Sequence, residues 1–535
     1  MRALLPLLTV AAPAVLVTAA MMVTTSSSAR RFTGLAVSAS LAALFLALAV
    51  ALLVVMAGAV TSPMLGAAGI GASVRVDALS SIMLVLVAFI GVIVVRYARN
   101  YLDGDPGHVR FTRWLLFTLA AVLVLIVSGN LALLILAWVA TSLALNNLLL
   151  FYPERPAARR AAAKKFWISR VGDACLVAAA ALLYARFGTL DIAVLNEAAS
   201  VAASSGEMSA LVMFAALLIV ATAVLKSAQL PLHGWLLEVM ETPTPVSALL
   251  HAGIINAGGY LVLRLADVML LATPALELLA LIGGATALFG SLVMLTQTSV
   301  KVQLAYSTVA QMGFMLLQCG LGAFSSALLH IVAHSLYKAH AFLSSGSVMD
   351  LARSSWSPSP GGQPHPARLL IGLGIVVAAT LLIGALFGPS PTVNPGSLAL
   401  GAVLLMALVH LMSGAIDERP DTYVLVRTAL GATAVAAAYF GLQAGMAYVT
   451  AGSLPSGGAI VGSPEIAIAT LVIVSFAVLT VFQNQMARRA AEPFWQAAYV
   501  HLRHGLYLNT LANRFLLRLE PASRRPAASA QRVTH

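Results

Sequence analysis

The chain has 535 residues, of which 60% are hydrophobic and only 9% are charged. A soluble domain carries about 25% charged residues, so these side chains cannot cover a water-facing surface. A spanning helix needs about 20 residues. When the loops between the helices are added, the length accommodates about fifteen spans. The composition therefore predicts an all-α polytopic membrane protein, and it excludes a soluble enzyme, a single-span anchor and an outer-membrane barrel.

The charge balance is positive, with 31 Lys and Arg against 19 Asp and Glu, which gives a net charge of +12. In a membrane protein such an excess marks cytoplasmic loops. The sequence gives no sign of nucleic-acid binding, because it lacks the pattern of interleaved basic and aromatic residues. The two cysteines, Cys175 and Cys319, lie in apolar runs and form no C-x-x-C motif. We therefore expect no cofactor and no thiolate metal site.

Fifteen apolar runs predict the transmembrane helices. The first run looks superficially like a secretory signal peptide, but a retained first span is favoured because polytopic proteins insert by their own first helix. The runs cover residues 4–23, 33–60, 78–95, 112–128, 131–151, 167–184, 211–226, 246–263, 270–295, 302–319, 323–348, 369–387, 398–412, 424–448 and 466–482.

The loops between these runs sort by charge. By the positive-inside rule the basic, odd-numbered loops are cytoplasmic, which places the N-terminus outside and the C-terminus inside a bacterial inner membrane. After residue 482 the tail mixes arginines with aromatic and aliphatic residues, which predicts an amphipathic helix on the membrane surface or against a partner protein. The basic loop residues are Arg30, Arg31, Arg96, Arg99, Arg110, Arg113, Arg155, Arg159, Arg160, Lys164, Lys165, Arg353 and Arg368.

A lysine and a proline mark the first unusual feature inside the membrane. Lys226 ends an apolar run and is followed by polar residues and by Pro231, which lacks an N–H and breaks a helix. Charges within spans are costly and usually functional, so Lys226 is a candidate proton carrier, although a lysine at a span end can also snorkel to the interface. His251, in the next span, is by itself more typical of a satisfied core histidine.

The strongest cluster is a ladder of His330, His334 and Lys338, spaced four residues apart on one helical face. Histidine titrates near physiological pH, so the ladder suits stepwise proton transfer. A zinc site is the weaker interpretation, because no third ligand is evident and the lysine opposes a metal ion. Asp173, one turn after Arg170, is the clearest intramembrane acid and predicts an orienting ion pair that could also balance Lys226.

Five stretches closely resemble the proton-translocating antiporter-like family, which includes the large membrane subunit of respiratory complex I and the Mrp sodium/proton antiporters. The resemblance covers roughly residues 111–349. The stretches are RVGD at 170–173, KSAQLPLH at 226–233, METPTPVSALLHA at 240–252, LAYSTVAQMG at 304–313, and the ladder itself.

The resemblance implies two inverted five-helix repeats, each with a broken helix, the first break lying near Lys226. It implies the divisions 1–110 (N-terminal helices), 111–265 (first repeat), 266–416 (second repeat), 417–484 (C-terminal helices) and 485–535 (basic cytoplasmic tail). Two family features are missing: residues 137–142 lack the glutamate of the fifth span, and residues 371–389 carry no charged residue. The implied proton pathway consists of Lys226, His251, His330, His334, Lys338, Asp173 and Glu241.

The segments LLFYPERP at 149–156 and LHAGIINAGGYL at 250–261 are similar to one branch in particular, DabB. That branch implies a cation-conducting subunit, with protons as the preferred ion, of an energy-coupled inorganic carbon (CO2/bicarbonate) uptake complex. It also implies a cytoplasmic partner, the DabA zinc protein similar to β-carbonic anhydrases, which would hydrate CO2, so this chain is expected to be no enzyme. The alternatives are an Mrp-like antiporter subunit, a complex I-like or hydrogenase membrane arm, or a non-conducting scaffold.

Overall fold

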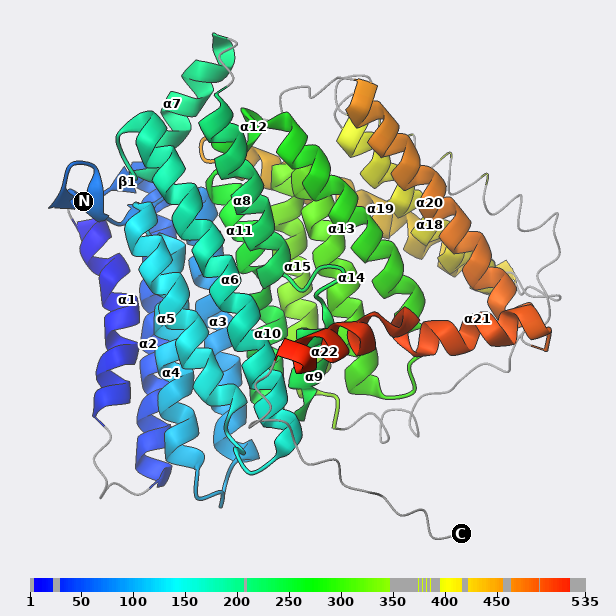
Figure 1. Ribbon diagram of the computed structural model, residues 1–535, viewed down its shortest axis with the longest axis horizontal. Helices are drawn as coiled ribbons and strands as arrows, with labels where there is room; N and C mark the ends of the chain where they lie inside the picture. The colour runs from blue at the N-terminus through cyan, green and yellow to red at the C-terminus, as the bar shows by residue number, and fades with distance from the viewer. Residues whose placement is uncertain are drawn as a thin grey trace.

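The computed structural model of the chain is a bundle of long helices (Figure 1). It describes residues 4–22, 29–205, 209–346, 395–415, 422–455, 463–489 and 491–519, together with residues 374, 378, 382 and 385. The predicted span at 369–387 and the Ser- and Pro-rich stretch at 354–366 therefore lie outside the described residues, apart from those four isolated positions.

The first part of the bundle contains five helices and two small hairpins. The helices are α1 (Leu4–Met21), α2 (Ala29–Ala57), α3 (Ala78–Tyr101), α4 (His108–Val127) and α5 (Leu131–Leu149). Between α2 and α3, β1 (Val60–Thr61) pairs antiparallel with β4 (Arg75–Val76), and β2 (Leu65–Ala67) pairs with β3 (Ile70–Ala72). We call the end of the bundle that holds these strands the hairpin end.

The opposite end holds the loop between α3 and α4 and the start of α6 (Pro156–Phe187). The loop itself carries no arginine, but Arg96 and Arg99 in the last turns of α3 and Arg110 and Arg113 in the first turns of α4 flank it, and we call this end the arginine end (Figure 1). Helix α7 (Ile192–Ser204) follows α6 at the hairpin end, and α8 (Ala210–Lys226) runs back from there into the bundle. A chain of short elements follows, consisting of α9 (Gly234–Glu238), η1 (Val239–Glu241), α10 (Thr244–Ala252), η2 (Ile254–Asn256), α11 (Ala257–Arg264) and α12 (Ala266–Leu270).

Three helices then cross the bundle next to these short elements: α13 (Thr273–Met294), α14 (Val300–Gly320) and α15 (Phe324–Leu343). Glycines draw α13 and α14 together, because a Cβ at Gly283 would lie 2.5 Å from the Leu317 nitrogen and one at Gly313 would lie 2.6 Å from the Ala287 nitrogen. Such small-residue contacts are a common way for membrane helices to approach closely. This packing fixes α14, which carries several polar residues of the site.

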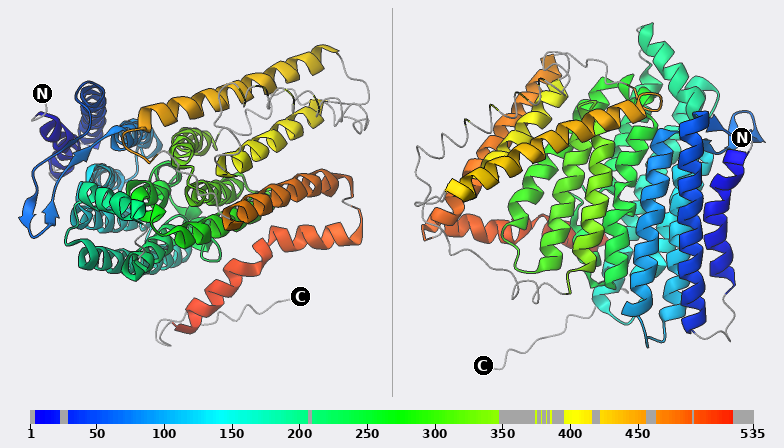
Figure 2. Two further views of the ribbon diagram at one scale, coloured as in Figure 1. Left: turned by 90° about the horizontal axis from the view of Figure 1, so that it is seen from above. Right: turned by 180° about the vertical axis from the view of Figure 1, so that it is seen from behind.

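The last helices lie to one side of the bundle (Figure 2). They are α18 (Pro395–Ala415), α19 (Thr422–Thr450) and α20 (Ser463–Arg488). The tail then forms α21 (Pro493–Arg503), η3 (Gly505–Tyr507) and α22 (Leu508–Leu519), which run across the bundle toward α9 rather than along it (Figures 1 and 2).

The predicted all-α membrane fold is confirmed, whereas the count of fifteen spans is not. Among the described residues, nine helices are long and apolar enough to cross a membrane, and further apolar helices are shorter. Each of the fourteen predicted runs that lie in the described ranges overlaps a helix. The prediction that Lys164 and Lys165 belong to a loop is wrong, because α6 begins at Pro156 and buries both side chains, which are 7% and 4% exposed.

Candidate functional site

The site is built around the point where α8 stops. Helix α8 ends at Lys226, and residues 227–233 form an irregular segment before α9, with a positive φ at Ala228 and a cis bond between Leu230 and Pro231. Side chains and backbone hold this segment: Ser227 Oγ donates to the Ile255 carbonyl at 3.0 Å, and the Leu230 N–H donates to Thr286 Oγ1 at 3.2 Å. Irregular backbone at membrane depth is tolerated where protein satisfies it in this way.

Asp173 joins two cations next to this break. Its Oδ2 lies 2.6 Å from Arg170 Nη2 and its Oδ1 lies 2.8 Å from Lys226 Nζ. Lys226 also sits over the Trp138 ring, with its ammonium 5.3 Å from the ring centroid. Asp173 is therefore the orienting acid for Arg170 and the counter-ion of Lys226 at the same time.

A second lysine, which the sequence reading assigned to a loop, lies close to this cluster. Lys165 Nζ donates to the Ser142 carbonyl oxygen at 3.1 Å and to Ser142 Oγ at 3.0 Å. Within the described residues no carboxylate forms an ion pair with it. Ser142 belongs to the stretch where the antiporter-like pattern has an acid, so a hydroxyl and a carbonyl contact this lysine instead of a carboxylate.

His251 lies in α10 and has no exposed surface. Its Nδ1 shares a hydrogen bond of 2.9 Å with Thr308 Oγ1, and its ring stacks on Phe342 with the centroids 4.3 Å apart. The backbone carbonyl of His251 lies 3.2 Å from His334 Nε2. His251 and the ladder are therefore parts of one cluster.

The ladder residues share one face of α15 as the spacing predicted. The rings of His330 and His334 stack with their centroids 6.1 Å apart. Lys338 is fully buried, and its Nζ donates to Ser307 Oγ at 2.8 Å and to the Leu304 carbonyl at 3.2 Å. The Nε2 atoms of His251 and His330 are buried and have no hydrogen-bond partner in the described part of the chain.

The described residues show no direct hydrogen bond between Lys226 and His251, so the candidate residues form two groups. A short polar connection lies between the groups. Ser227, next to Lys226, bonds the carbonyl of Ile255, and Asn256 Nδ2 bonds Ser335 Oγ at 2.9 Å, beside His334. Asn256 and Ser335 were not singled out in the sequence, because neither residue type is unusual in a span.

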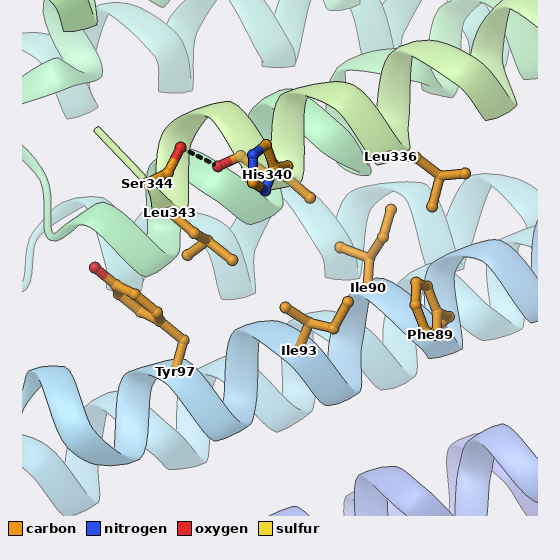
Figure 3. Close-up of a pocket in the computed structure, with 9 residues that line it drawn as sticks. Phe89, Ile90, Ile93, Tyr97, Leu336, His340, Leu343 and Ser344 are labelled. Carbon is orange, nitrogen blue, oxygen red and sulfur yellow. Dashed lines mark hydrogen bonds between the residues drawn. The ribbon is translucent and has the colours of Figure 1, made fainter. Parts of the chain in front are cut away.

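His340, the next histidine along α15, and Glu241, an expected pathway residue, complete the set of residues near the two groups in sequence. His340 is exposed on α15 and faces α3, where it lines a cavity of about 380 Å³ that is mostly apolar (Figure 3). Glu241 ends η1, and its side chain lies outside the described residues. Among the described residues, no group of three His, Cys, Asp or Glu side chains could hold a metal ion.

The tail contacts the bundle next to the broken helix, through a cluster that we call the tail clasp: Lys164, Glu238, Asn509 and Asn513. Lys164 Nζ lies 3.0 Å from Glu238 Oε1 and donates to Asn509 Oδ1 and Asn513 Oδ1, both at 2.6 Å. The two asparagine amides donate back to Glu238 Oε1, at 3.0 and 2.7 Å. Every partner in the tail clasp is therefore hydrogen-bonded.

A glycine makes room for this contact. A Cβ at Gly234 would lie 1.7 Å from Asn509 Oδ1. Any larger residue at this position would therefore force either α22 or the backbone of α9 to move. Leu502 of α21 packs in a small apolar cluster with Phe289, Val293 and Tyr306. The tail therefore docks on its own chain, and its other face remains exposed.

An ion-paired aspartate lies outside the membrane-spanning helices, at the hairpin end. Asp77 caps α3 and accepts from the Ser80 N–H at 3.0 Å, while its Oδ2 lies 2.6 Å from Arg264 Nη1 and 3.1 Å from Arg75 Nε. Burial acts to raise the pKa of Asp77, but the Arg264 charge, the Ser80 N–H and the Arg75 charge outweigh it and lower the pKa to about 2. The group joins the start of α3 to the end of α11 at the hairpin end.

Comparison with known proteins supports one family. The family model described as "NADH:quinone oxidoreductase/Mrp antiporter, TM" matches residues 128–357, and the model for the N-terminus of complex I chain 5 matches residues 64–112. The structure is similar to the Mrp complex from Dietzia sp. DQ12-45-1b, with a TM-score of 0.64 and 24% identity, over 97% of this chain and 61% of that chain. This likeness confirms the antiporter-like fold.

Curated relatives narrow the assignment. A protein of Halothiobacillus neapolitanus named "Probable inorganic carbon transporter subunit DabB2" is 39% identical over 86% of this chain and 84% of its own length. The DabB protein of Hydrogenovibrio crunogenus is 48% identical over 52% of this chain and 54% of its own. NADH-quinone oxidoreductase subunit L of Escherichia coli is 35% identical over 63% of this chain and 56% of its own length. The chain therefore belongs to the DabB family of membrane subunits, within the larger group of NADH:quinone oxidoreductase and Mrp antiporter proteins.

Proposed function

We propose that this chain is the proton-conducting membrane subunit of an energy-coupled inorganic carbon uptake complex. Protons move along the buried and partly buried groups Asp173, Lys226, His251, His334, His330 and Lys338. The observation that carries the proposal is the continuous row of His330, His334 and Lys338 on α15, joined to His251 by the bond between His334 Nε2 and the His251 carbonyl.

The chemistry of these groups favours protons over sodium. Imidazole and amine nitrogens bind and release protons, whereas Na⁺, like other hard cations, prefers oxygen ligands. The one carboxylate in the described part of this pathway is Asp173, and it already forms ion pairs with Arg170 and Lys226. A sodium ion would have to displace one of them.

The energy of proton entry is sufficient to drive a partner. One elementary charge that crosses the membrane releases about 2.3 kcal/mol per 100 mV, whereas a tenfold bias in an equilibrium needs about 1.4 kcal/mol. We propose that this energy drives CO2 hydration to bicarbonate by a cytoplasmic zinc partner of the DabA type. The chemistry then belongs to the partner, and this chain acts as a transporter subunit without enzymatic activity of its own.

The tail and the adjacent start of α6 are the surfaces proposed for that partner. The tail clasp holds one face of α22, while Phe494, Val500, Leu506 and Leu511 remain between 47% and 69% exposed. Exposed apolar residues beside basic ones fit either a protein partner or the membrane surface. The positive-inside rule places this end in the cytoplasm, where the partner is expected.

The test is co-expression with the adjacent gene in a host that lacks carbonic anhydrase. Growth at ambient CO2 that a protonophore abolishes is the expected result. Rescue that survives collapse of the gradient would refute energy coupling, and no rescue with a correctly assembled complex would refute carbon uptake.

The second candidate is an Mrp-like antiporter subunit or a complex I-like or hydrogenase arm, which the match to the NADH:quinone oxidoreductase/Mrp antiporter model favours. Cation/proton exchange by reconstituted vesicles without any carbon-dependent growth would support that function. A neighbouring run of small membrane subunits in the genome would favour it too, whereas a large soluble protein with zinc ligands favours carbon uptake.

A further inference from the structure

One buried cation beside the broken helix has no counter-charge. Asp173 forms ion pairs with Arg170 and Lys226, and all three lie close enough for their charges to act on that of Lys165. In the part of the chain that the structure describes, this group therefore contains three cations and one carboxylate. The Arg170 side chain is 25% exposed, whereas Lys165 is only 4% exposed and forms no ion pair among these residues. The charge of Lys165 is the one left uncompensated.

The present contacts of Lys165 do not supply that compensation. Its Nζ donates to the Ser142 carbonyl at 3.1 Å and to Ser142 Oγ at 3.0 Å, and both oxygens are uncharged. An ammonium group carries three N–H bonds, so one donor remains open as well. Burial of a charge is strongly unfavourable unless the charge is paired and hydrogen-bonded, and both requirements are unmet here.

A second open donor lies on the same face of α5. Trp138, one helical turn before Ser142, is 3% exposed, and its Nε1 is buried without a hydrogen-bond partner in the described residues. An indole N–H can only donate, and it usually finds an acceptor when it is buried. Lys226 Nζ lies 5.3 Å from the centroid of the same ring. Helices α5 and α6 therefore each supply an unused donor, and a cation of α8 lies beside them.

These open groups select the kind of ligand that fits. A water molecule accepts hydrogen bonds but leaves the charge uncompensated, and a metal cation is repelled by Lys165 and Lys226. A carboxylate-type anion brings one negative charge and two oxygens, which can accept from donors on two different helices. A small monovalent carboxylate therefore meets both requirements at once.

We propose that Lys165 and Trp138 hold a small carboxylate-type anion between α5 and α6, where it acts as the counter-ion of Lys165. Helix α6 starts at Pro156, at the arginine end. At a rise of 1.5 Å per residue, Lys165 lies about 14 Å from that start, so the anion enters from this end. In the carbon uptake complex proposed above, bicarbonate is the anion of this type that the partner produces. This identity rests on the proposed function, whereas the site itself does not.

Thermal unfolding of the purified chain in detergent tests the site without a partner and without conduction. Sodium formate is the probe because it is the smallest carboxylate, and sodium gluconate at the same ionic strength is the bulky control. A ligand that binds only the folded state stabilises it as the ligand concentration rises. We expect formate, and bicarbonate at mildly alkaline pH, to raise the unfolding temperature, and gluconate to leave it unchanged.

Variants assign this response to the two donors. Lys165→Met should abolish the effect of formate, whereas Lys164→Met, which changes the adjacent lysine of the tail clasp, should retain it. Trp138→Phe keeps the aromatic ring but loses the N–H, so the formate concentration needed for the same effect should rise at least tenfold. This milder change keeps the test decisive if Lys165→Met does not fold.

Ser142→Glu gives the complementary test, because it places a carboxylate of the chain itself next to Lys165. It should raise the unfolding temperature in the absence of formate and remove the response to formate. Ser142→Gln, which has the same size but no charge, should not stabilise the protein. A Ser142→Glu protein that is no more stable than Ser142→Gln would refute the role of the anion as a counter-charge.

Three further results would overturn the proposal: equal effects of formate and gluconate, a full response to formate in Lys165→Met, or chloride acting at the same concentration as formate, which would exclude a carboxylate-type site. A response to formate without one to bicarbonate would refute bicarbonate as the occupant. If formate binds as expected but the complex supports no carbon-dependent growth, the proposed function fails and the anion site stands.

Discussion

Asn509 Nδ2 in α22 donates a hydrogen bond of 3.0 Å to Glu238 Oε1 in α9, across 271 residues of sequence. Glu238 is the last residue of the short helix that follows the break after Lys226. The tail is therefore attached directly to the irregular part of the bundle. A motion of α9 would change the contacts of α22, and a force on α22 would reach α9.

The double variant Asn509→Ala/Asn513→Ala should release α22, because it removes four hydrogen bonds to Lys164 and Glu238. Hydrogen exchange of residues 508–519 should rise by at least tenfold in the purified protein. Gly234→Ala should do the same by a different route, since its new Cβ would collide with Asn509. Arg514→Ala, which changes an exposed residue of the same helix, is the control. Equal protection in all four proteins would contradict the tail clasp.

Lys226→Gln should abolish proton flux while the protein still folds, because the glutamine keeps a hydrogen-bonding group near Asp173 but cannot carry the proton. Asp173→Asn should instead destabilise the protein by about 1 to 3 kcal/mol, less than the loss of a fully buried partner, since it leaves two partly buried cations, Arg170 and Lys226, without their carboxylate. Thermal unfolding in detergent and flux into vesicles separate the two effects. Normal flux in Lys226→Gln would remove this lysine from the pathway.

His334→Gln and His340→Gln form a matched pair on α15. His334 is buried and bonded to the His251 carbonyl, whereas His340 is exposed toward α3. We expect His334→Gln to lower proton flux at least a hundredfold and His340→Gln to change it less than twofold. A loss of the same size in both variants would point to damage of α15 as a whole.

Lys164→Met and Lys165→Met test whether two adjacent lysines have separate roles. Lys164 holds the tail, and Lys165 contacts Ser142 beside the Asp173 group. Lys164→Met should therefore expose the tail to protease, and Lys165→Met should leave the tail protected while proton flux changes at least fivefold. The assignment fails if limited proteolysis cuts both variants equally fast.

Asp77→Asn should lower stability at pH 7 by about 3 to 5 kcal/mol, because Arg264 would be left buried beside a neutral amide. The lowered pKa of Asp77, about 2, means that this contribution is complete above the pKa of an unfolded aspartate, about 3.9, and disappears as the pH falls toward 2. Unfolding temperatures at pH 7 and pH 3 should therefore differ less for Asp77→Asn than for the unmodified protein.

The sequence was sufficient for the membrane fold, the break after Lys226 and the shared face of His330, His334 and Lys338, because each follows from local periodicity or from a proline. It was insufficient for Lys165, since a lysine near a cluster of basic residues reads as a loop charge until the helix start is known. Contacts across long separations, such as Asn509 with Glu238 or Asn256 with Ser335, carry no local signal at all, because amide side chains are ordinary at either position.

The attachment of the tail to α9 has a thermodynamic corollary. Coupling between two sites is reciprocal: if a change of the broken helix alters the affinity of the tail for a partner tenfold, binding of that partner shifts the equilibrium of the broken helix by the same factor. A subunit that acts on its partner through this connection is therefore acted on by that partner to the same extent in free energy.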